Sequence, residues 1–473
     1  MNVGFFEFNQ NPWHLALSFE IAQIELEKGN NVFYYFLGHT VKENQRHIYY
    51  RKFARLQTCL LPEYRVGKKL KKLHPGKFHF SDQYPGSVID YTRSENLMLL
   101  AQEAAKNELV DELHDSVPAF SLHEENLKNK SNAYFETFYL TKKEIIRNNL
   151  ELIYTYNGRF LHEAAVWESC RSLEVPCNFH EKFEPIWGDR YWIFKDGVHN
   201  SKERAIVINN FWDSSKYSYS DKIDFANSWL DKRRKGISQP YTKSQIPGKL
   251  EESTPPKYVL FMHSSDDELI ASGLGVSKVW GRQEIAIKRI EAILNSRTDL
   301  ELIVRVHPNL LTRSLEEQMR WQKIFSQLNC KVINAGDSVD TYAMIEKAVC
   351  VISFGSTAGV EASLLGVPSI LIGPALHADL HATINIDSES EFLSVLGKAL
   401  KKELDFEANI IQAVKYAFFY EKGGEQMRFN ILIGDPRTQD PPLKVVGVVL
   451  KSSAILSKAY SLLSRFRRIH SEI

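Results

Sequence analysis

The chain has 473 residues, more than one hydrophobic core usually supports, so two domains of roughly 200 residues each are expected. Hydrophobic residues make up 44% of it and charged residues 25%, which excludes a largely disordered protein. Lysine and arginine number 59 against 58 acidic residues, so no overall charge would draw the chain to nucleic acid.

The five cysteines form an odd set without C-x-x-C spacing, which predicts neither a disulfide framework nor a zinc cluster. The N-terminus lacks the basic and apolar regions of a secretory signal. No stretch reaches the ~18 uninterrupted apolar residues of a membrane-spanning helix. Together these features predict a cytoplasmic protein.

The first half of the chain opens with a β-α-β pattern. Apolar runs at 3–8 and 31–37 flank a stretch at 15–27 with helical spacing. A mostly polar, helical region follows, and then a strand at 152–156 and a helix at 164–172. Residues 1–235 are therefore expected to form a Rossmann-like domain.

The charged stretch 232–256 is rich in proline and glycine, which indicates a linker between domains. Beyond it strands and helices alternate, which predicts a second parallel sheet in residues 257–435. The expected strands lie at 258–262, 302–306, 331–334, 350–353 and 369–372. The predicted fold class is α/β, with two Rossmann-like doubly wound domains and a cleft between them. Ligands of such sheets bind at the carboxyl ends of the strands.

Two loops of the second predicted domain follow strands at that edge. The first is Arg305-Val306-His307-Pro308-Asn309, where an imidazole could donate to a phosphate and proline sets the turn. The second runs from Ser353 to Ala362 and combines small residues with hydroxyls before a helix.

In the second loop, Ser356 and Thr357 would face a phosphate, and Glu361 would accept hydrogen bonds from ribose hydroxyls. Each loop alone also fits a simpler role, because His-Pro is often only a turn and Ser-Thr often only caps a helix. The two loops on one sheet edge favour a nucleotide-phosphate site that includes Arg305, His307, Pro308, Asn309, Ser353, Ser356, Thr357 and Glu361.

Residues 305–308, paired with 353–368, resemble the donor-nucleotide half of GT-B glycosyltransferases, particularly the bacterial capsule and lipopolysaccharide group. In that group, as in GT-B sialyltransferases and Kdo transferases, an HP motif and a Ser/Thr pair hold a CMP-sugar. The resemblance covers about 258–373 and is only architectural over the first 230 residues. It implies donor binding in the C-terminal domain, with His307 on the donor phosphate, and acceptor binding in the N-terminal domain. The family's Asp/Glu-Asp-Gly motif is not clear in the N-terminal half.

Two sets of carboxylates compete for the role of base or nucleophile. Asp266 and Asp267 follow the first strand of the second domain, where repulsion between the two carboxylates would raise the pKa of one of them. They also fit a structural role, as acidic residues at the capped N-terminus of a helix. Glu181 is the other candidate.

Three further residues were assigned to the N-terminal side. Asn157 and Arg159 follow a strand and precede a helix, as residues of an acceptor-facing loop would, although Asn-Gly is also simply a turn. His14 lies at the first junction of strand and helix, within reach of an acceptor hydroxyl; as a lone histidine it also fits a purely structural place.

No metal-binding motif and no P-loop occurs in the sequence, so no cofactor is expected and the nucleotide-sugar is a substrate. A helix N-terminus and His307 would neutralise the leaving phosphate without a metal ion.

The segment 443–473 carries six basic residues and one acidic residue. Four of the basic ones recur every seven residues, and apolar residues are spaced by three and four, which predicts an amphipathic basic helix. Such a helix would bind an anionic membrane surface at the inner face of the cytoplasmic membrane, or pack on the protein body or on a second copy of the chain.

The sequence and the resemblance together predict a metal-independent glycosyltransferase of surface polysaccharide assembly. It would move a sugar from a nucleotide-sugar, with a CMP-linked acidic sugar preferred, to a glycan or glycolipid acceptor. The same phosphate site would suit a UDP-sugar-dependent hexosyltransferase or epimerase, or a CDP-polyol phosphotransferase. A non-catalytic scaffold of the assembly complex is the alternative outside enzymes. No nucleic-acid partner is expected, and a homodimer remains open.

Overall fold

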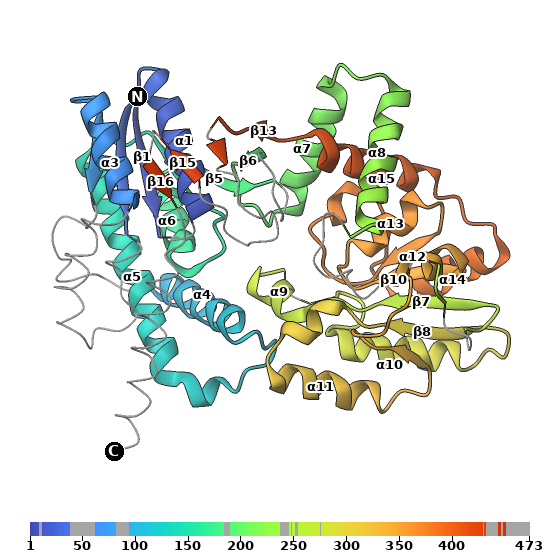
Figure 1. The fold of residues 1–473 in the computed structure, drawn as a ribbon. Helices are drawn as coiled ribbons and strands as arrows, with labels where there is room; N and C mark the ends of the chain where they lie inside the picture. The colour runs from blue at the N-terminus through green and yellow to red at the C-terminus, as the bar shows by residue number, and fades with distance from the viewer. Residues whose placement is uncertain are drawn as a thin grey trace.

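The computed structural model describes residues 1–8, 12–37, 62–81, 94–183, 190–236, 246, 248–250, 254–274, 276–428, 430–431, 443–445 and 448–450. Among these residues, two large sheets lie in two lobes, each flanked by helices (Figure 1). The predicted fold class, two doubly wound α/β sheets, is confirmed.

The first sheet has the strand order β13-β6-β5-β4-β1-β2-β3. Strands β1 to β5 pair in parallel, whereas β6 runs antiparallel to β5. Six of its strands come from the first half of the chain: β1 (Asn2–Glu7), β2 (Asn31–Phe36), β3 (Phe78–Ser81), β4 (Leu152–Tyr156), β5 (Cys177–Lys182) and β6 (Arg190–Phe194).

Helices of the first half are α1 (Pro12–Glu27), α3 (Pro62–Leu73), α4 (Glu95–Leu113), α5 (Glu124–Arg147), α6 (Leu161–Ser172), α7 (Ser201–Ser214) and α8 (Tyr219–Arg234), with a 3-10 turn, η1 (Phe120–His123). The polar region that was expected to be helical contains α4 and α5, and also the edge strand β3. Asn200 caps α7, and Ser218 forms a capping box with Asp221 at the start of α8.

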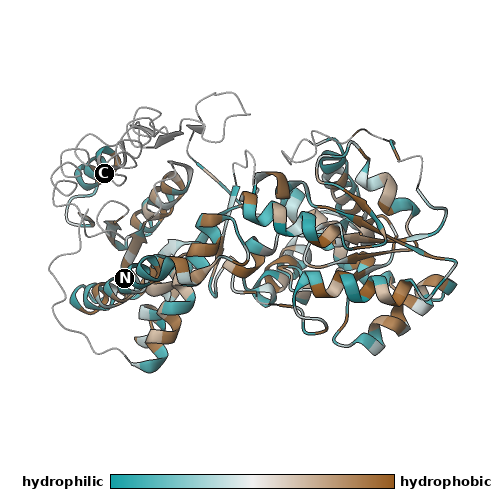
Figure 2. Cartoon of the chain, turned by 90° about the horizontal axis from the view of Figure 1, so that it is seen from below, coloured by the Kyte–Doolittle hydropathy of each residue, from teal (hydrophilic) through white to brown (hydrophobic). Residues whose placement is uncertain are grey.

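The second sheet has the order β12-β11-β10-β7-β8-β9, and all its strands are parallel. Its strands are β7 (Tyr258–Met262), β8 (Glu301–Arg305), β9 (Lys331–Ile333), β10 (Cys350–Ser353), β11 (Ser369–Leu371) and β12 (Ile384–Asn385). The central strands are buried on both faces, which explains their continuous apolar sequences (Figure 2).

The elements that accompany this sheet are α9 (Asp266–Ala271), α10 (Gln283–Leu294), η3 (Pro308–Thr312), α11 (Leu315–Phe325), α12 (Thr341–Lys347), α13 (Ala358–Leu364), η4 (Ala378–Leu380), α14 (Glu389–Lys401) and α15 (Glu407–Lys422). The predicted strands and helices of 258–372 agree with these bounds to within a few residues.

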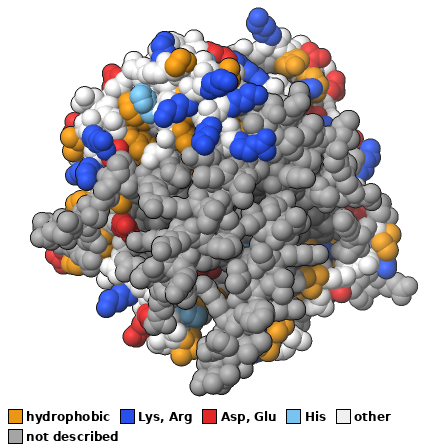
Figure 3. Space-filling model, turned by 60° about the vertical axis from the view of Figure 1, so that its left-hand side comes forward, with side chains coloured by type: hydrophobic (Ala, Val, Ile, Leu, Met, Phe, Trp, Pro, Cys, Tyr) orange, Lys and Arg blue, Asp and Glu red, His pale blue; other side chains and the backbone are white. Residues whose placement is uncertain are grey.

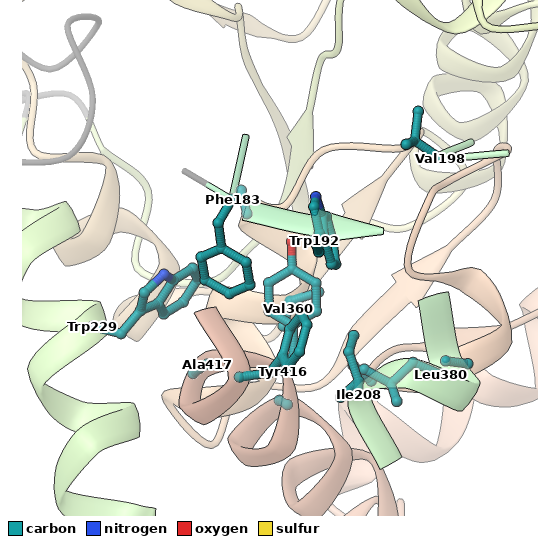
Figure 4. Packing of buried hydrophobic residues seen from close by; sticks show 14 of the residues in the cluster. Phe183, Trp192, Val198, Ile208, Trp229, Val360, Leu380, Tyr416 and Ala417 are labelled. Atoms are coloured by element: carbon teal, nitrogen blue, oxygen red, sulfur yellow. The ribbon is translucent and has the colours of Figure 1, made fainter. Parts of the chain in front are cut away.

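One core cluster joins the two lobes. Helix α15 packs against α8 of the first half, and its aromatic side chains contact β6 (Figure 4). The Phe419 ring lies 5.3 Å from that of Trp192, and the Tyr416 ring lies 5.8 Å from that of Trp229. Because each buried aromatic ring removes a large apolar area from water, this cluster holds the lobes in a defined relation.

The chain then returns to the first lobe. Strand β13 (Glu425–Gln426), inside the range 257–435 expected for the second domain, pairs antiparallel with β6 of the first sheet. In the other direction, α7 and α8, inside 1–235, contact η4 and α15. Each half of the chain therefore contributes elements that pack on the lobe of the other half, which a division of the sequence at one linker does not predict.

The start of the predicted C-terminal helix is wrong. Residues of 443–473 form strands β15 (Leu443–Val445) and β16 (Val448–Leu450). In a small antiparallel sheet, β15 pairs with β16 on one side and with β14 (Asn430–Ile431) on the other. Valine is β-branched and favours strands, and this preference outweighs the seven-residue spacing of lysines there. Residues 451–473 lie outside the described residues.

Candidate functional site

A cavity of about 540 Å³ lies between the lobes and is lined by both halves of the chain. From the first half come side chains of α4, α7, α8 and the loops after β4 and β6. From the second half come the loops after β7, β8, β10 and β11, which is the carboxyl edge of the second sheet. This is the edge at which open parallel sheets bind ligands.

Arg305, the last residue of β8, is 1% exposed and lines this cavity. Its Nε donates to Thr341 Oγ1 at 3.3 Å and its Nη1 to the carbonyl of Asn334, while Nη2 is buried without a hydrogen-bond partner. Burial lowers the pKa of Arg305, and Asp337 opposes this without forming an ion pair. A buried donor of this kind needs an acceptor, which a ligand or a water molecule in the cavity would supply.

His307, Pro308 and Asn309 follow Arg305 along the same wall of the cavity. His307 Nδ1 accepts a hydrogen bond from the backbone N–H of Asn309 at 3.1 Å, so in the neutral ring the proton is on Nε2. The backbone N–H of His307 donates to His263 Nδ1 at 3.3 Å. The loop is thus held on both sides, and His307 is positioned as a donor.

Ser356 and Thr357 line the cavity from the loop between β10 and α13, next to Gly355. Gly355 has φ +132°, and a Cβ there would lie 2.5 Å from the carbonyl oxygen of Pro374, so the glycine is needed for the packing of two loops rather than for approach of a ligand. Ser356 Oγ accepts from Ala358 N at 3.2 Å, one residue before the N-cap of α13, Thr357, which makes no side-chain capping bond. Ser353 is fully buried and does not line the cavity.

Glu361 lines the cavity, but α8 already supplies its partner. Arg233 Nε donates to Glu361 Oε1 at 2.5 Å, and Arg233 Nη2 donates to Thr357 Oγ1 at 3.0 Å. The carboxylate expected to accept ribose hydroxyls is therefore part of a buried ion pair between the lobes.

Of the carboxylates considered as a base, Asp267 lines the cavity. It is 2% exposed, and its Oδ2 lies 3.0 Å from Arg313 Nε and 3.9 Å from His114 Nδ1. Asp266 begins α9, but its side chain lies outside the described residues.

The residues assigned to the N-terminal side are separated by the fold. Arg159 lines the cavity and forms an ion pair with Asp111 at 2.9 Å. Asn157 Nδ2 donates to Glu181 Oε2 at 2.5 Å, and neither side chain lines the cavity. His14 is also absent from the lining; it is 5% exposed and its ring centroid lies 4.0 Å from that of Tyr156. Burial, with smaller contributions from Lys182 and His180, holds the pKa of His14 well below its usual value.

The lining of this cavity carries an excess of positive charge. Among the described residues, five arginines line it against three carboxylates. Each carboxylate has an arginine partner, in the pairs Arg159–Asp111, Arg233–Glu361 and Arg313–Asp267. Arg204 and Arg305 have no carboxylate partner within the part of the chain that the structure describes. The cavity is therefore suited to an anion.

Sequence reasoning missed several lining residues, among them His199, Arg204, Arg233, Arg313 and His377. His377 follows β11, so the strand-end rule that selected His307 could have found it. Arg204 and Arg233 lie on helices that reach the second sheet only through packing of the two lobes, and no local motif marks them.

Within the described ranges, no group of three or more His, Cys, Asp or Glu side chains is placed to hold a metal ion. None of the helices in the described part of the chain has the length and apolar character needed to cross a membrane.

No family model and no curated protein sequence matches this chain. Among solved structures, it is similar to KpsC of Thermosulfurimonas dismutans, a beta Kdo 2,4 transferase, at 14% identity and a TM-score of 0.37, over 64% of this chain and 85% of KpsC. It is also similar to S. aureus MnaA, solved with UDP, at 10% identity and a TM-score of 0.28, over 89% of this chain and 93% of MnaA. Acinetobacter baumannii MurG matches at 10% identity and a TM-score of 0.28, over 88% of this chain and 94% of MurG. Similarities at these low identities and TM-scores leave the chemistry of the cavity to be argued from its own residues.

Proposed function

We propose that this protein is a GT-B type glycosyltransferase that binds a nucleotide-sugar in the cavity between its lobes. The observation that carries the proposal is Arg305, a buried guanidinium without a carboxylate partner, on the same cavity wall as His307. Ser356 and Thr357 bring two hydroxyls to that cavity. A phosphate would supply the acceptor that Arg305 Nη2 lacks.

In the proposed reaction, the acceptor hydroxyl oxygen bonds to the anomeric carbon of the donor, and the bond from that carbon to the phosphate oxygen breaks. The nucleotide leaves with the bonding electrons, and Arg305 and His307 stabilise the negative charge that develops on its phosphate. The proton of the acceptor hydroxyl passes to a carboxylate, a role we assign to Asp267 because it is the candidate carboxylate that lines the cavity.

The preferred donor is a CMP-linked acidic sugar, and the acceptor is a glycan or a lipid-linked sugar of surface polysaccharide assembly. The donor preference rests on the sequence resemblance of 305–308 and 353–368 described above. A cavity formed by both lobes fits the proposal, since closure of the lobes would exclude water that would hydrolyse the donor.

We further propose contact with an anionic membrane surface. Exposed Arg65, Lys68, Lys69, Lys71 and Lys72 lie on α3, and Figure 3 shows Lys and Arg side chains gathered on the upper part of the side that carries this helix. Strand β16, near the start of the basic C-terminal segment, contacts α3. Each basic residue near an anionic leaflet contributes on the order of 1 kcal/mol.

The test of the function is a thermal-shift panel of CMP, UDP and CDP on the wild type and on His307→Asn. Stabilisation by CMP that weakens in the variant supports the preferred donor. Stabilisation by UDP would indicate a hexosyltransferase or epimerase, and by CDP a polyol phosphotransferase. A wild type that responds to none of the three would contradict the proposal and favour a non-catalytic scaffold.

A further inference from the structure

Three cavity residues outside the phosphate wall come together from distant parts of the chain. His199 lies just before α7, Arg204 lies in the first turn of that helix, and His377 directly precedes η4. All three line the cavity. The Ser201 hydroxyl donates to the Asp379 carboxylate, which fixes α7 beside η4.

Arg204 is held rigidly without being neutralised. Its Nε donates to the carbonyl of Val198 at 2.6 Å, and its Nη1 donates to the Tyr420 hydroxyl at 2.9 Å. The guanidinium carbon lies 4.7 Å from the ring centre of Trp192. Within the described part of the chain, these partners are all uncharged, so the positive charge is placed but not compensated.

The two histidines beside it have unused polar atoms. His199 Nδ1 and His377 Nε2 are buried and lack hydrogen-bond partners. Burial lowers the pKa of both rings, and the charge of Arg204 lowers each further. The rings are therefore neutral. With the proton on His199 Nδ1 and on His377 Nε2, each ring has a donor that an oxyanion beside Arg204 would accept.

His377 and Arg305 follow or end strands that are not neighbours in the second sheet. His377 follows β11 and Arg305 ends β8, and β10 and β7 lie between these strands. Three strand spacings put these two strand ends roughly 14 Å apart, so we take the two groups to hold separate anionic groups of the ligand.

We propose that Arg204, His199 and His377 form a second oxyanion-binding subsite, which takes a carboxylate or a phosphate of the ligand other than the phosphate held at Arg305. The inference rests on the proposed function, because it takes that ligand to be a nucleotide-sugar. It assigns to the enzyme a ligand with two separate anionic groups.

The first experiment is independent of any nucleotide. Inorganic phosphate is titrated in a thermal-shift assay against the wild type, the double variant His199→Asn/His377→Asn and the control His381→Asn. His381 is exposed, lies in the same segment as His377, and has φ +56°, a conformation that asparagine tolerates. We expect the double variant to need roughly tenfold more phosphate for the same stabilisation, and the control to match the wild type. If the double variant does not fold, the two single variants take its place.

The second experiment identifies the source of the oxyanion by calorimetry. It compares conjugates that differ in one carboxylate: UDP-glucuronate against UDP-glucose, and CMP-N-acetylneuraminate against its methyl ester. Tighter binding of an acidic conjugate by roughly tenfold, lost in the double variant, supports a carboxylate. Equal binding within each pair, together with the loss of phosphate response, supports a phosphate instead.

The two hypotheses fail in different ways. The subsite is refuted when the double variant and His381→Asn respond alike to phosphate and to the acidic conjugates. The proposed function fails, and the subsite stands, when no nucleotide or conjugate binds but the phosphate response still depends on His199 and His377.

Discussion

β1 and β7 occupy equivalent places in their sheets: β1 lies between β2 and β4, and β7 lies between β8 and β10. Charged residues end strands at the carboxyl edge of both sheets: Glu7 ends β1, and Arg305 ends β8 next to β7. Glu7 is fully buried, and its Oε1 accepts from Ser18 Oγ at 2.7 Å and lies 2.7 Å from His180 Nε2. Arg305 is equally buried and has only uncharged hydrogen-bond partners.

The difference shows how one topology gives two kinds of edge. At the first edge Glu7 Oε1 contacts His180 on β5, although Glu7 Oε2 and His180 Nδ1 have no hydrogen-bond partner among the described residues; removing one member of such a buried pair is costly. At the second edge the partner is missing within the described protein, and a cavity lies there instead. Breaking the first edge should therefore cost stability, and breaking the second should cost binding.

The largest effect is expected at Glu7. Glu7→Ala leaves buried His180 and Ser18 without their acceptor, and the free energy of unfolding should fall by about 3 kcal/mol or more. Urea unfolding followed by circular dichroism measures this, with Glu7→Gln, which keeps an oxygen acceptor, as the control. A loss in Glu7→Ala below that of Glu7→Gln would show that the pair does not stabilise the sheet.

Arg305→Gln should have the opposite profile. Nucleotide affinity should fall roughly tenfold to a hundredfold, since hydrogen bonds to charged groups contribute about 1.5–3 kcal/mol. The free energy of unfolding should fall less than in Glu7→Ala, because the substitution also removes an uncompensated buried charge. Calorimetry with the nucleotide and urea unfolding on the same sample measure both. A stability loss as large as that of Glu7→Ala would indicate that Arg305 is structural.

A third expectation concerns acid. Burial lowers the pKa of His14, His162, His199, His263 and His377. For His377 the pKa falls from 6.5 to about 4, so below pH 6.5 the unfolded chain takes up a proton that the folded protein does not. Stability should therefore fall as the pH drops from 6.5 toward 4, by about 1.4 kcal/mol per pH unit for each such histidine.

Buried Glu163, whose pKa is raised by burial, acts in the opposite sense, since the folded protein keeps its proton where the unfolded chain has lost it. Urea unfolding at several pH values therefore compares the wild type with His377→Asn. Between pH 6.5 and 4, the slope of the free energy of unfolding against pH should be smaller in the variant by about 1.4 kcal/mol per pH unit. An unchanged slope would contradict a neutral His377 in the folded protein.

The sequence predicts much of the second sheet because its parallel strands are buried on both faces and read as apolar runs between turns. The strand-end rule also selected Arg305, His307, Ser356 and Thr357, which line the cavity. It could not find the ion pair of Arg233 with Glu361, whose members are 128 residues apart and meet only because α8 packs on the second lobe. The helix expected from residue 443 failed because the spacing of charges was weighed above the β-branched valines.

The smallest effect is expected for Ser356→Ala, which separates the two readings of that hydroxyl. Ser356 Oγ accepts from Ala358 N at 3.2 Å at the start of α13, so the substitution should lower the free energy of unfolding by about 1 kcal/mol through loss of this hydrogen bond. If the hydroxyl also donates to a ligand phosphate, nucleotide affinity should fall severalfold more than it does in Ser314→Ala, because Ser314 caps α11 with a comparable hydrogen bond but does not line the cavity. Equal affinities in the two variants, with equal losses of stability, would limit Ser356 to this structural hydrogen bond and leave the binding of anions at the second edge to Arg305 and His307.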